Sequence, residues 1–215
     1  MRAPPSRAPA DIQHDLGSLA VVALEAPTGD LEIEDARVER CDLSGQRIGR
    51  LVIRGSLLEH VSFAGCIVTA SRWRDVRLSQ CDLSNAVFSG FEVSRVELAG
   101  CKLAGFRAVE CRWKDVLNED CDLRYAQFTG GQLLRCEFIR CQLQEADLRG
   151  ADLGASVFQE ANLQRADLTG ARLHGADLRG AGIDGIQIQA QDVRGAIVTP
   201  AQAMELAKLL GIVIR

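Results

Sequence analysis

The apolar side chains of this chain recur every five residues, a spacing that belongs neither to a helix nor to a strand. The pattern is plainest between Ala146 and Ala181, where a small, a polar and a large apolar residue return in the same order. The large apolar column spans 34 consecutive positions, Ile33 to Val198, and only Ala108 and Asn118 depart from it. A second column, two residues earlier, consists mainly of Ala, Cys and Ser. A repeat of this length decides the fold before any local structure is assigned.

Two inward positions in every five residues predict a chain that turns a corner at each repeat and stacks on itself. Four such sides form a square coil of 20 residues, so residues 31–198 give about 8.5 coils and a rod about 40 Å long. Small and large side chains together fill the interior, which leaves no room for a ligand. Trp73 and Trp113 are expected to fill this core, and Phe106 to replace the volume that Ala108 lacks. The sequence thus predicts an all-β fold.

All eight cysteines fall in the small-residue column. The chain has no CxxC pair and no secretory signal, and its cysteines alternate with alanine, so we expect reduced core thiols and neither disulfides nor zinc ligands. Cysteines spaced by 20 residues should form a ladder whose parallel Cβ vectors hold the sulfurs too far apart for a bridge. This ladder comprises Cys81, Cys101, Cys121 and Cys141.

The N-terminal segment, residues 1–30, lies outside the repeat. Its first ten residues, MRAPPSRAPA, are proline-rich and predicted to be disordered. The apolar run Leu19 to Leu24 is predicted to form a strand that covers the open first coil. The sequence leaves open whether the rest of this segment caps the rod or binds a partner.

The C-terminal segment, residues 199–215, predicts a short capping α-helix. Thr199 is the expected N-cap, Pro200 the first helical residue, Gln202 the partner in a capping box and Gly211 the end. Ala203, Leu206, Ala207 and Leu210 share one helix face, which is expected to close the last coil. The apolar tail that follows has nothing left to cover it within the rod, so it is a candidate dimer contact. The candidate contact residues are Leu206, Leu210, Ile212, Val213 and Ile214.

Composition excludes several functions. The net charge of -4 supplies no basic surface for nucleic acid or for an anionic membrane, and no apolar run is long enough to cross a bilayer, so a cytoplasmic protein is expected. His14, His60 and His174 lie in the N-terminal segment and at predicted outer corners, without a nucleophile, base and orienting group. We expect no catalytic residue, no cofactor and no metal.

The A(D/N)LXX pattern resembles the pentapeptide-repeat family, which implies a right-handed quadrilateral β-helix. The ending TPAQAMELAKLLGIVI is similar to the C-terminal segment of the quinolone-resistance, mycobacterial fluoroquinolone-resistance and albicidin-resistance branches. That resemblance implies a homodimer joined through this segment. It also implies a DNA mimic that binds DNA gyrase or topoisomerase IV and protects it from antibiotics, as in resistance and self-resistance. Several members of these branches carry projecting loops, which the unbroken repeat here lacks.

The polar position just before each large apolar residue supplies the candidate topoisomerase-facing residues. Stacking at 20-residue intervals predicts three rows of carboxylates on three sides of the rod. Alternatively, aspartates at this position solubilise the rod and bond to neighbouring backbone. A scaffold or signalling adaptor that binds an unrelated protein along a flat face is the competing function. The candidate rows are Asp42, Asp82 and Asp122, then Asp147 and Asp167, then Asp152 and Asp192.

Overall fold

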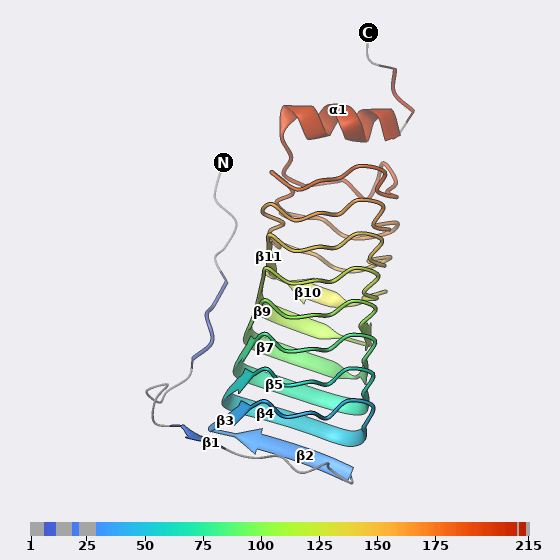
Figure 1. The fold of residues 1–215 in the computed structure, drawn as a ribbon. Helices are drawn as coiled ribbons and strands as arrows, with labels where there is room; N and C mark the ends of the chain where they lie inside the picture. The colour runs from blue at the N-terminus through green and yellow to red at the C-terminus, as the bar shows by residue number, and fades with distance from the viewer. Residues whose placement is uncertain (1–6, 12–18, 22–28, 210, 214–215) are drawn as a thin grey trace.

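The computed structural model describes residues 7–11, 19–21, 29–209 and 211–213, and it shows a rod of stacked coils with one helix across its end (Figure 1). The helix α1 spans Pro200–Leu209. The strands are β1 Ala20–Val21, β2 Gly29–Glu34, β3 Ala36–Glu39, β4 Arg47–Glu59, β5 Ile67–Ser79, β6 Val87–Ser89, β7 Phe91–Ala99, β8 Arg107–Val109, β9 Arg112–Glu119, β10 Gln132–Leu134 and β11 Glu137–Ile139.

Strand pairing confirms the 20-residue coil. Every strand pair in the described part of the chain is parallel, and in β4 and β5 the partners are 20 residues apart, as in Ile53 with Trp73. Isolated bridges at the same spacing continue the ladders to Asp177 and Ile197. Separate ladders run through positions such as Asp82, Gln127, Gln132 and Glu137, one for each side of the coil. The fold is therefore a β-helix with four sides, as the period of five predicts.

Corners between sides explain how the chain turns every five residues. The residue two places after each large apolar position commonly has a positive φ, as at Gly45 (70°), Gly65 (65°) and His60 (55°). This left-handed backbone is open to glycine without strain, and at other residues it is held by the hydrogen bonds of the stacked coils. The corner amide of Gly65, for example, donates to the carbonyl of Ser84 at 2.8 Å.

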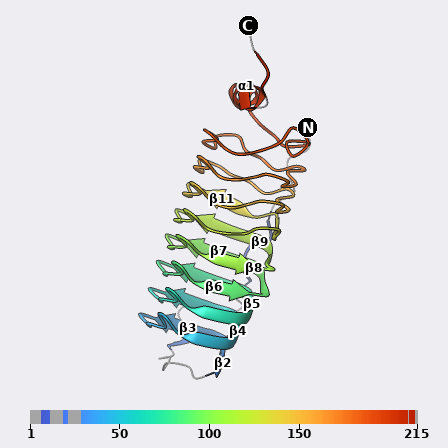
Figure 2. The ribbon, with the colours of Figure 1, turned by 90° about the vertical axis from the view of Figure 1, so that its right-hand side faces the viewer.

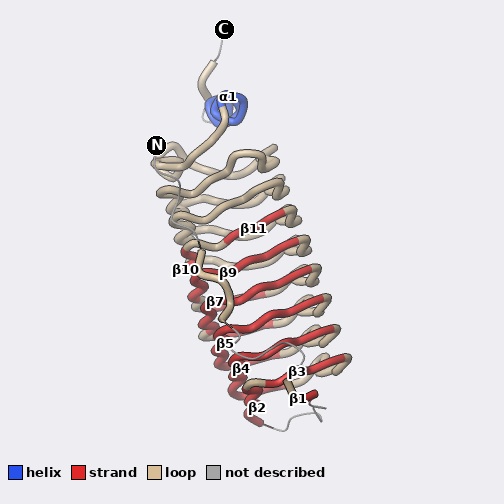
Figure 3. The backbone as a smooth tube through the Cα atoms, turned by 90° about the vertical axis from the view of Figure 1, so that its left-hand side faces the viewer, coloured by secondary structure: helices blue, strands red, loops and turns tan. Residues whose placement is uncertain are grey.

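The core consists of the two predicted columns. Phe63, Trp73, Phe88, Phe91 and Trp113 are all nearly inaccessible to solvent, and neighbouring rings contact one another at centroid distances of 5.0 to 6.5 Å. Both tryptophans are therefore core residues, as predicted. Beyond residue 140 the small column is mainly alanine, and the regular strands give way to short bridges and turns (Figure 3).

The cysteines lie within the small-residue column of the core. Cys66, Cys81, Cys101, Cys111, Cys121, Cys136 and Cys141 are buried free thiols, and Cys41 is half-buried. Many of the thiols donate to a carbonyl 23 residues earlier, as Cys101 does to Leu78 at 3.7 Å. Burial raises the pKa of Cys111 to about 12. The prediction that the cysteines lie in the core is confirmed for these seven.

Thiol reactivity tests this placement. We expect the seven buried thiols to resist a disulfide reagent such as DTNB in the native protein, because neither the reagent nor hydroxide reaches them. They should react together once urea unfolds the rod. Rapid reaction of the ladder cysteines without loss of the β-sheet signal in circular dichroism would contradict the packing described.

The two ends of the rod are closed by different means. At the first coil, β1 adds to β3 in parallel through Ala20 with Ala36 and Val21 with Arg37, and Leu19 is buried beside it. The predicted N-terminal strand is thus confirmed at Ala20–Val21, and residues 22–24 lie outside the described residues. At the other end, α1 lies across the last coil (Figure 2).

Candidate interaction surfaces

The first predicted row does not form a continuous acidic strip. Its ladder runs Asp42, Ser62, Asp82, Lys102 and Asp122, so the carboxylates are two coils apart and a lysine stands between the last two. Each carboxylate also bonds to local backbone, since each accepts the amide N–H of the residue two places later at 2.9, 2.8 and 3.1 Å. This local bonding is the alternative role that turn chemistry predicts.

The second predicted row brings two carboxylates together. Asp147 and Asp167 are direct ladder neighbours, and the guanidinium of Arg149 approaches both, at 2.7 and 3.7 Å. They line a depression of about 390 Å³. The hydrogen bond from Arg149 lowers the pKa of Asp147 against the opposing effect of burial. The other polar side chains in the depression are Glu145, Arg165 and Gln187.

The third predicted row breaks at its last member. Asp152 lies beside Arg172, which donates to it at 3.0 Å. Asp192 is only 7% exposed, and its carboxylate accepts the backbone N–H groups of Gly170 and Gln189 at 2.8 and 3.0 Å. The prediction of Asp192 in a surface row is therefore wrong. Gln191, which the register places inward, is exposed, because its long polar side chain does not suit the small core position. Asp192 is buried in the turn that replaces the regular repeat there.

Arginines form ion pairs with four of the candidate carboxylates, those of Asp122, Asp147, Asp167 and Asp152. Arg124 holds Asp122 at 2.7 Å, and the pKa of Asp122 is lowered chiefly by that hydrogen bond. A lowered folded-state pKa means that such a pair contributes fully to stability at neutral pH, and that the contribution is lost as pH falls below about 4. The candidate rows are thus mixed in charge. Any resemblance to duplex DNA rests on shape more than on charge.

At the C-terminal end of the rod, the helix α1 is capped at both of its ends. Thr199 and Gln202 form the predicted capping box. The backbone N–H of Gln202 donates to the Thr199 hydroxyl at 3.2 Å, and the side-chain Oε1 of Gln202 accepts the backbone N–H of Thr199 at 3.0 Å. Gly211 ends the helix with φ of 79°, and the amides of Gly211 and Ile212 donate to the carbonyls of Lys208 and Ala207. These bonds form a Schellman motif.

The predicted dimer residues divide into buried and exposed members. Leu206 is buried against the rod, whereas Ile212 is 57% and Val213 79% exposed. Leu210 and Ile214 lie outside the described residues. Between α1 and the last coil lies an apolar groove of about 260 Å³. Its lining includes Val193, Ala196, Val198, Ala203, Leu206 and Ile212.

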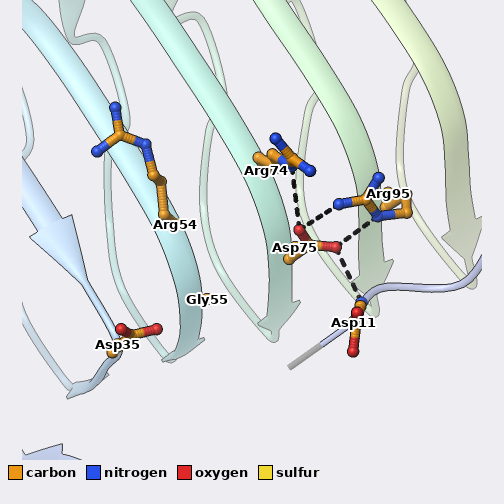
Figure 4. A pocket seen from close by; sticks show the side chains of 7 residues that line it. All are labelled: Asp11, Asp35, Arg54, Gly55, Arg74, Asp75 and Arg95. Carbon is orange, nitrogen blue, oxygen red and sulfur yellow. Dashed lines mark hydrogen bonds and ion pairs between the residues drawn. The ribbon is translucent and has the colours of Figure 1, made fainter. Parts of the chain in front are cut away.

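A third surface carries the described part of the N-terminal arm, residues 7–11. The arm runs along the outside of the rod, across the coils (Figure 1). Its Asp11 lines a polar pocket of about 250 Å³, in which Arg95 binds Asp75 through two guanidinium nitrogens, Nε and Nη2, and Arg74 approaches from the side (Figure 4). Asp35, Arg54 and Gly55 complete the pocket.

The described residues hold no group of three or more His, Cys, Asp or Glu side chains that could bind a metal ion. Within the same residues, no helix is both long and apolar enough to cross a membrane.

Comparison with known families agrees with the coil geometry. A model of the pentapeptide repeat region matches residues 71–148, and a model of eight copies of the pentapeptide repeat matches residues 146–181. Together these matches cover just over half of the chain. The chain belongs to the pentapeptide-repeat family.

The chain is also similar to solved structures of other proteins. The trypsin-treated plasmid-mediated fluoroquinolone resistance protein QnrB1 matches with a TM-score of 0.52 and 21% identity, covering 91% of this chain and 100% of its own. HetL, a protein of the cyanobacterium Nostoc involved in regulating heterocyst differentiation, matches with a TM-score of 0.42 and 18% identity, covering 80% and 89%. At these identities the likeness concerns the fold alone. Among curated proteins, none matches this sequence.

The attachment of the arm to this pentapeptide-repeat protein is the feature that sequence reasoning missed. The proline-rich composition predicts disorder, yet Ala10 is 7% exposed and Arg7 reaches two glutamates. The repeat itself contains a pattern that could have indicated this surface. Charges alternate at 20-residue spacing through Asp75, Arg95, Asp115 and Arg135, and stacking at that spacing predicts a ladder of ion pairs at one corner.

Proposed function

We propose that this pentapeptide-repeat protein is not an enzyme and binds a bacterial type II topoisomerase, DNA gyrase or topoisomerase IV, as a mimic of duplex DNA. In this proposal it protects the topoisomerase from an antibiotic that poisons it. The observation that carries the proposal is the C-terminal closure, in which a capped helix leaves an apolar groove and the exposed Ile212 and Val213. The sequence resembles the topoisomerase-binding branches at this same segment, and QnrB1 is a fluoroquinolone resistance protein.

The dimensions of the rod support mimicry of a duplex. The ladder from Asp42 to Gly182 extends through seven steps of about 4.8 Å, or about 34 Å, which is close to one turn of B-form DNA. Within the predicted rows, Asp147 and Asp167 are the pair of adjacent carboxylates, and they line a surface depression. We propose this face as the contact with the topoisomerase.

The proposal predicts protection in a supercoiling assay. Purified protein added at micromolar concentration to gyrase and a fluoroquinolone should reduce cleavage complexes and restore supercoiling. The variant Asp147→Asn/Asp167→Asn should need about tenfold more protein for the same effect, since charge complementarity governs association. The exposed Glu110, which lies outside the candidate rows, supplies the control Glu110→Gln, which should act as wild type. Unchanged cleavage complexes at micromolar protein would refute the proposal.

The same proposal includes a homodimer joined through the C-terminal groove and tail. Replacing the exposed Val213 by aspartate should shift the dimer to monomer and weaken association about tenfold or more, because the charge would lose its hydration in the interface. The matched control is Val109→Asp, at a valine that is 42% exposed on the side of the rod. Sedimentation velocity measures both. Equal masses for the wild type and the Val213 variant over a dilution series would argue against this interface.

The alternative function is an interaction scaffold or signalling adaptor that binds a protein unrelated to topoisomerase. The observation that favours it is the mixed charge of the candidate rows, in which Asp122 is paired with Arg124 and Asp152 with Arg172. A partner with alternating charges would match this surface better than a topoisomerase groove built for phosphates. Failure of the supercoiling assay with a folded dimer would favour this function.

A further inference from the structure

The N-terminal arm is held on the rod by polar contacts to side chains of several coils. The amide N–H of Asp11 donates to Asp75 Oδ1 at 2.9 Å, and that of Ala10 donates to Glu97 Oε1 at 3.2 Å. Arg7 contacts Glu97 at 3.2 Å and Glu137 at 3.6 Å. Because β5, β7 and β11 supply these acceptors, the arm crosses the coils and joins no sheet edge.

The acceptors repeat along the rod with a defined period. One corner carries Asp35, Asp75 and Asp115, and the adjoining face carries Glu97 and Glu137, each set spaced by 40 residues. Forty residues are two coils, or about 9.6 Å. Three residues of an extended or polyproline-like chain span about 9–10 Å. An extended chain on this surface therefore presents every third N–H to a carboxylate.

The arm follows this match. The backbone N–H of Asp11 donates to Asp75, and the backbone of Ala8, three residues earlier, lies near enough to Asp115, two coils further along, to lower the pKa of that carboxyl. Burial tends to raise the pKa of Asp115, but its bond to Arg135 and the Ala8 backbone bond lower it overall, so the acceptor is ionised. Arg95 and Arg135 fix the two aspartates in place by bidentate pairs. The carboxylates are thus positioned before any chain lies on them.

The side chains of the arm define what this surface selects. Arg7 is largely covered, with a side-chain exposure of 12%, and Ala10 is 7% exposed, whereas Ala8 and Pro9 face solvent. The surface therefore favours an arginine at the first position and a small residue at the fourth. The side chains at the second and third positions are free to vary, except that the second residue needs a backbone N–H and so is not proline. Few apolar contacts hold the arm, so it can be displaced.

We propose that the surface formed by Asp75, Asp115, Glu97 and Glu137 is a binding track for an extended, arginine-bearing peptide segment of a partner protein. The arm of this chain occupies the track as an intramolecular competitor. Because the tether gives the arm a high effective concentration, a partner must displace it to bind. This inference does not depend on the topoisomerase proposal, which uses other carboxylates.

A fluorescent peptide with the sequence Ser6–Asp11, SRAPAD, tests the track on the full chain. The variant Arg7→Ala, whose own arm is weakened, should bind the peptide at least tenfold more tightly than the wild type. A peptide with alanine in place of its arginine should bind at least tenfold more weakly. The variant Arg7→Ala/Glu97→Gln/Glu137→Gln should lose binding, whereas Arg7→Ala/Glu92→Gln, altered at a half-buried glutamate of β7 outside the track, should keep it.

Hydrogen exchange distinguishes a displaceable arm from a permanent strap. Excess SRAPAD should speed exchange at the amides of Ala10 and Asp11 in the wild type, with circular dichroism unchanged. Unchanged exchange, or equal peptide binding by the wild type and Arg7→Ala, would overturn the proposal. Protection of these amides that rises with protein concentration would assign the track to the arm of a second copy and would overturn it also.

Discussion

Replacing Phe106 by alanine should lower the free energy of unfolding by about 3–5 kcal/mol. The Phe106 ring is fully buried and contacts Phe88, Phe91 and Phe128 at centroid distances of 5.4, 6.0 and 6.2 Å. The large apolar position beside it holds Ala108, so truncation would leave two alanines on one side of that coil. The rigid stack above and below cannot collapse into the gap. Urea unfolding followed by circular dichroism measures the loss.

A compensating variant tests whether interior volume is the cause. Adding Ala108→Leu to Phe106→Ala restores the small and large order found in the other coils, and it should recover at least half of the lost stability. A cost below about 1 kcal/mol for Phe106→Ala alone, or no recovery in the double variant, would show that this coil is not packed as described.

Replacing Gln202 by leucine should release the capping helix and lower the free energy of unfolding by about 2 kcal/mol or more. Gln202 is 6% exposed, and its Nε2 donates to the carbonyls of Leu178 at 2.6 Å and Ala181 at 2.9 Å. Leucine has a similar size but removes both side-chain hydrogen bonds, so the carbonyl of Leu178 keeps only the N–H of Ala181 as a partner. Faster hydrogen exchange in α1 and a lower urea midpoint should follow.

The control for this substitution is Gln164→Leu, at an exposed glutamine on a corner of the rod. It should change stability by less than about 0.5 kcal/mol. If Gln202→Leu behaves like this control, the helix is not anchored through its glutamine.

The core could be predicted from the sequence because every coil packs its small and large side chains in the same arrangement. Leu148 belongs to the large apolar column and Cys141 to the small-residue column, so the five-residue register assigns both of them, and all other members of the two columns, to the core. The capping box of Thr199 and Gln202 could also be predicted, since it depends on two residues only three positions apart in the sequence.

The contacts between the end segments and the rod could not be predicted in detail, because they are not repeated along the chain. The helix face expected to pack on the last coil includes Ala203, yet Ala203 is exposed. Gln202 is buried instead, because its side-chain amide donates to the carbonyls of Leu178 and Ala181. Asp192 is buried for the complementary reason, because its carboxylate accepts the backbone N–H groups of Gly170 and Gln189.

The arm shows a second limit of sequence reasoning. Composition predicts disorder for MRAPPSRAPA because such a segment buries little apolar surface by itself. Arg7 and Ala10 are nevertheless held, because carboxylates from several coils converge on them. Residues 1–6 lie outside the described part of the chain.

Competition with DNA tests the central claim most directly. Purified protein should bind immobilised gyrase at micromolar concentration or below, and linear duplex DNA should reduce that binding in proportion to its own occupancy of the enzyme, since both would use the same groove. Binding that is unaffected by saturating duplex, or no binding at micromolar concentration, would contradict the account of this rod as a DNA mimic.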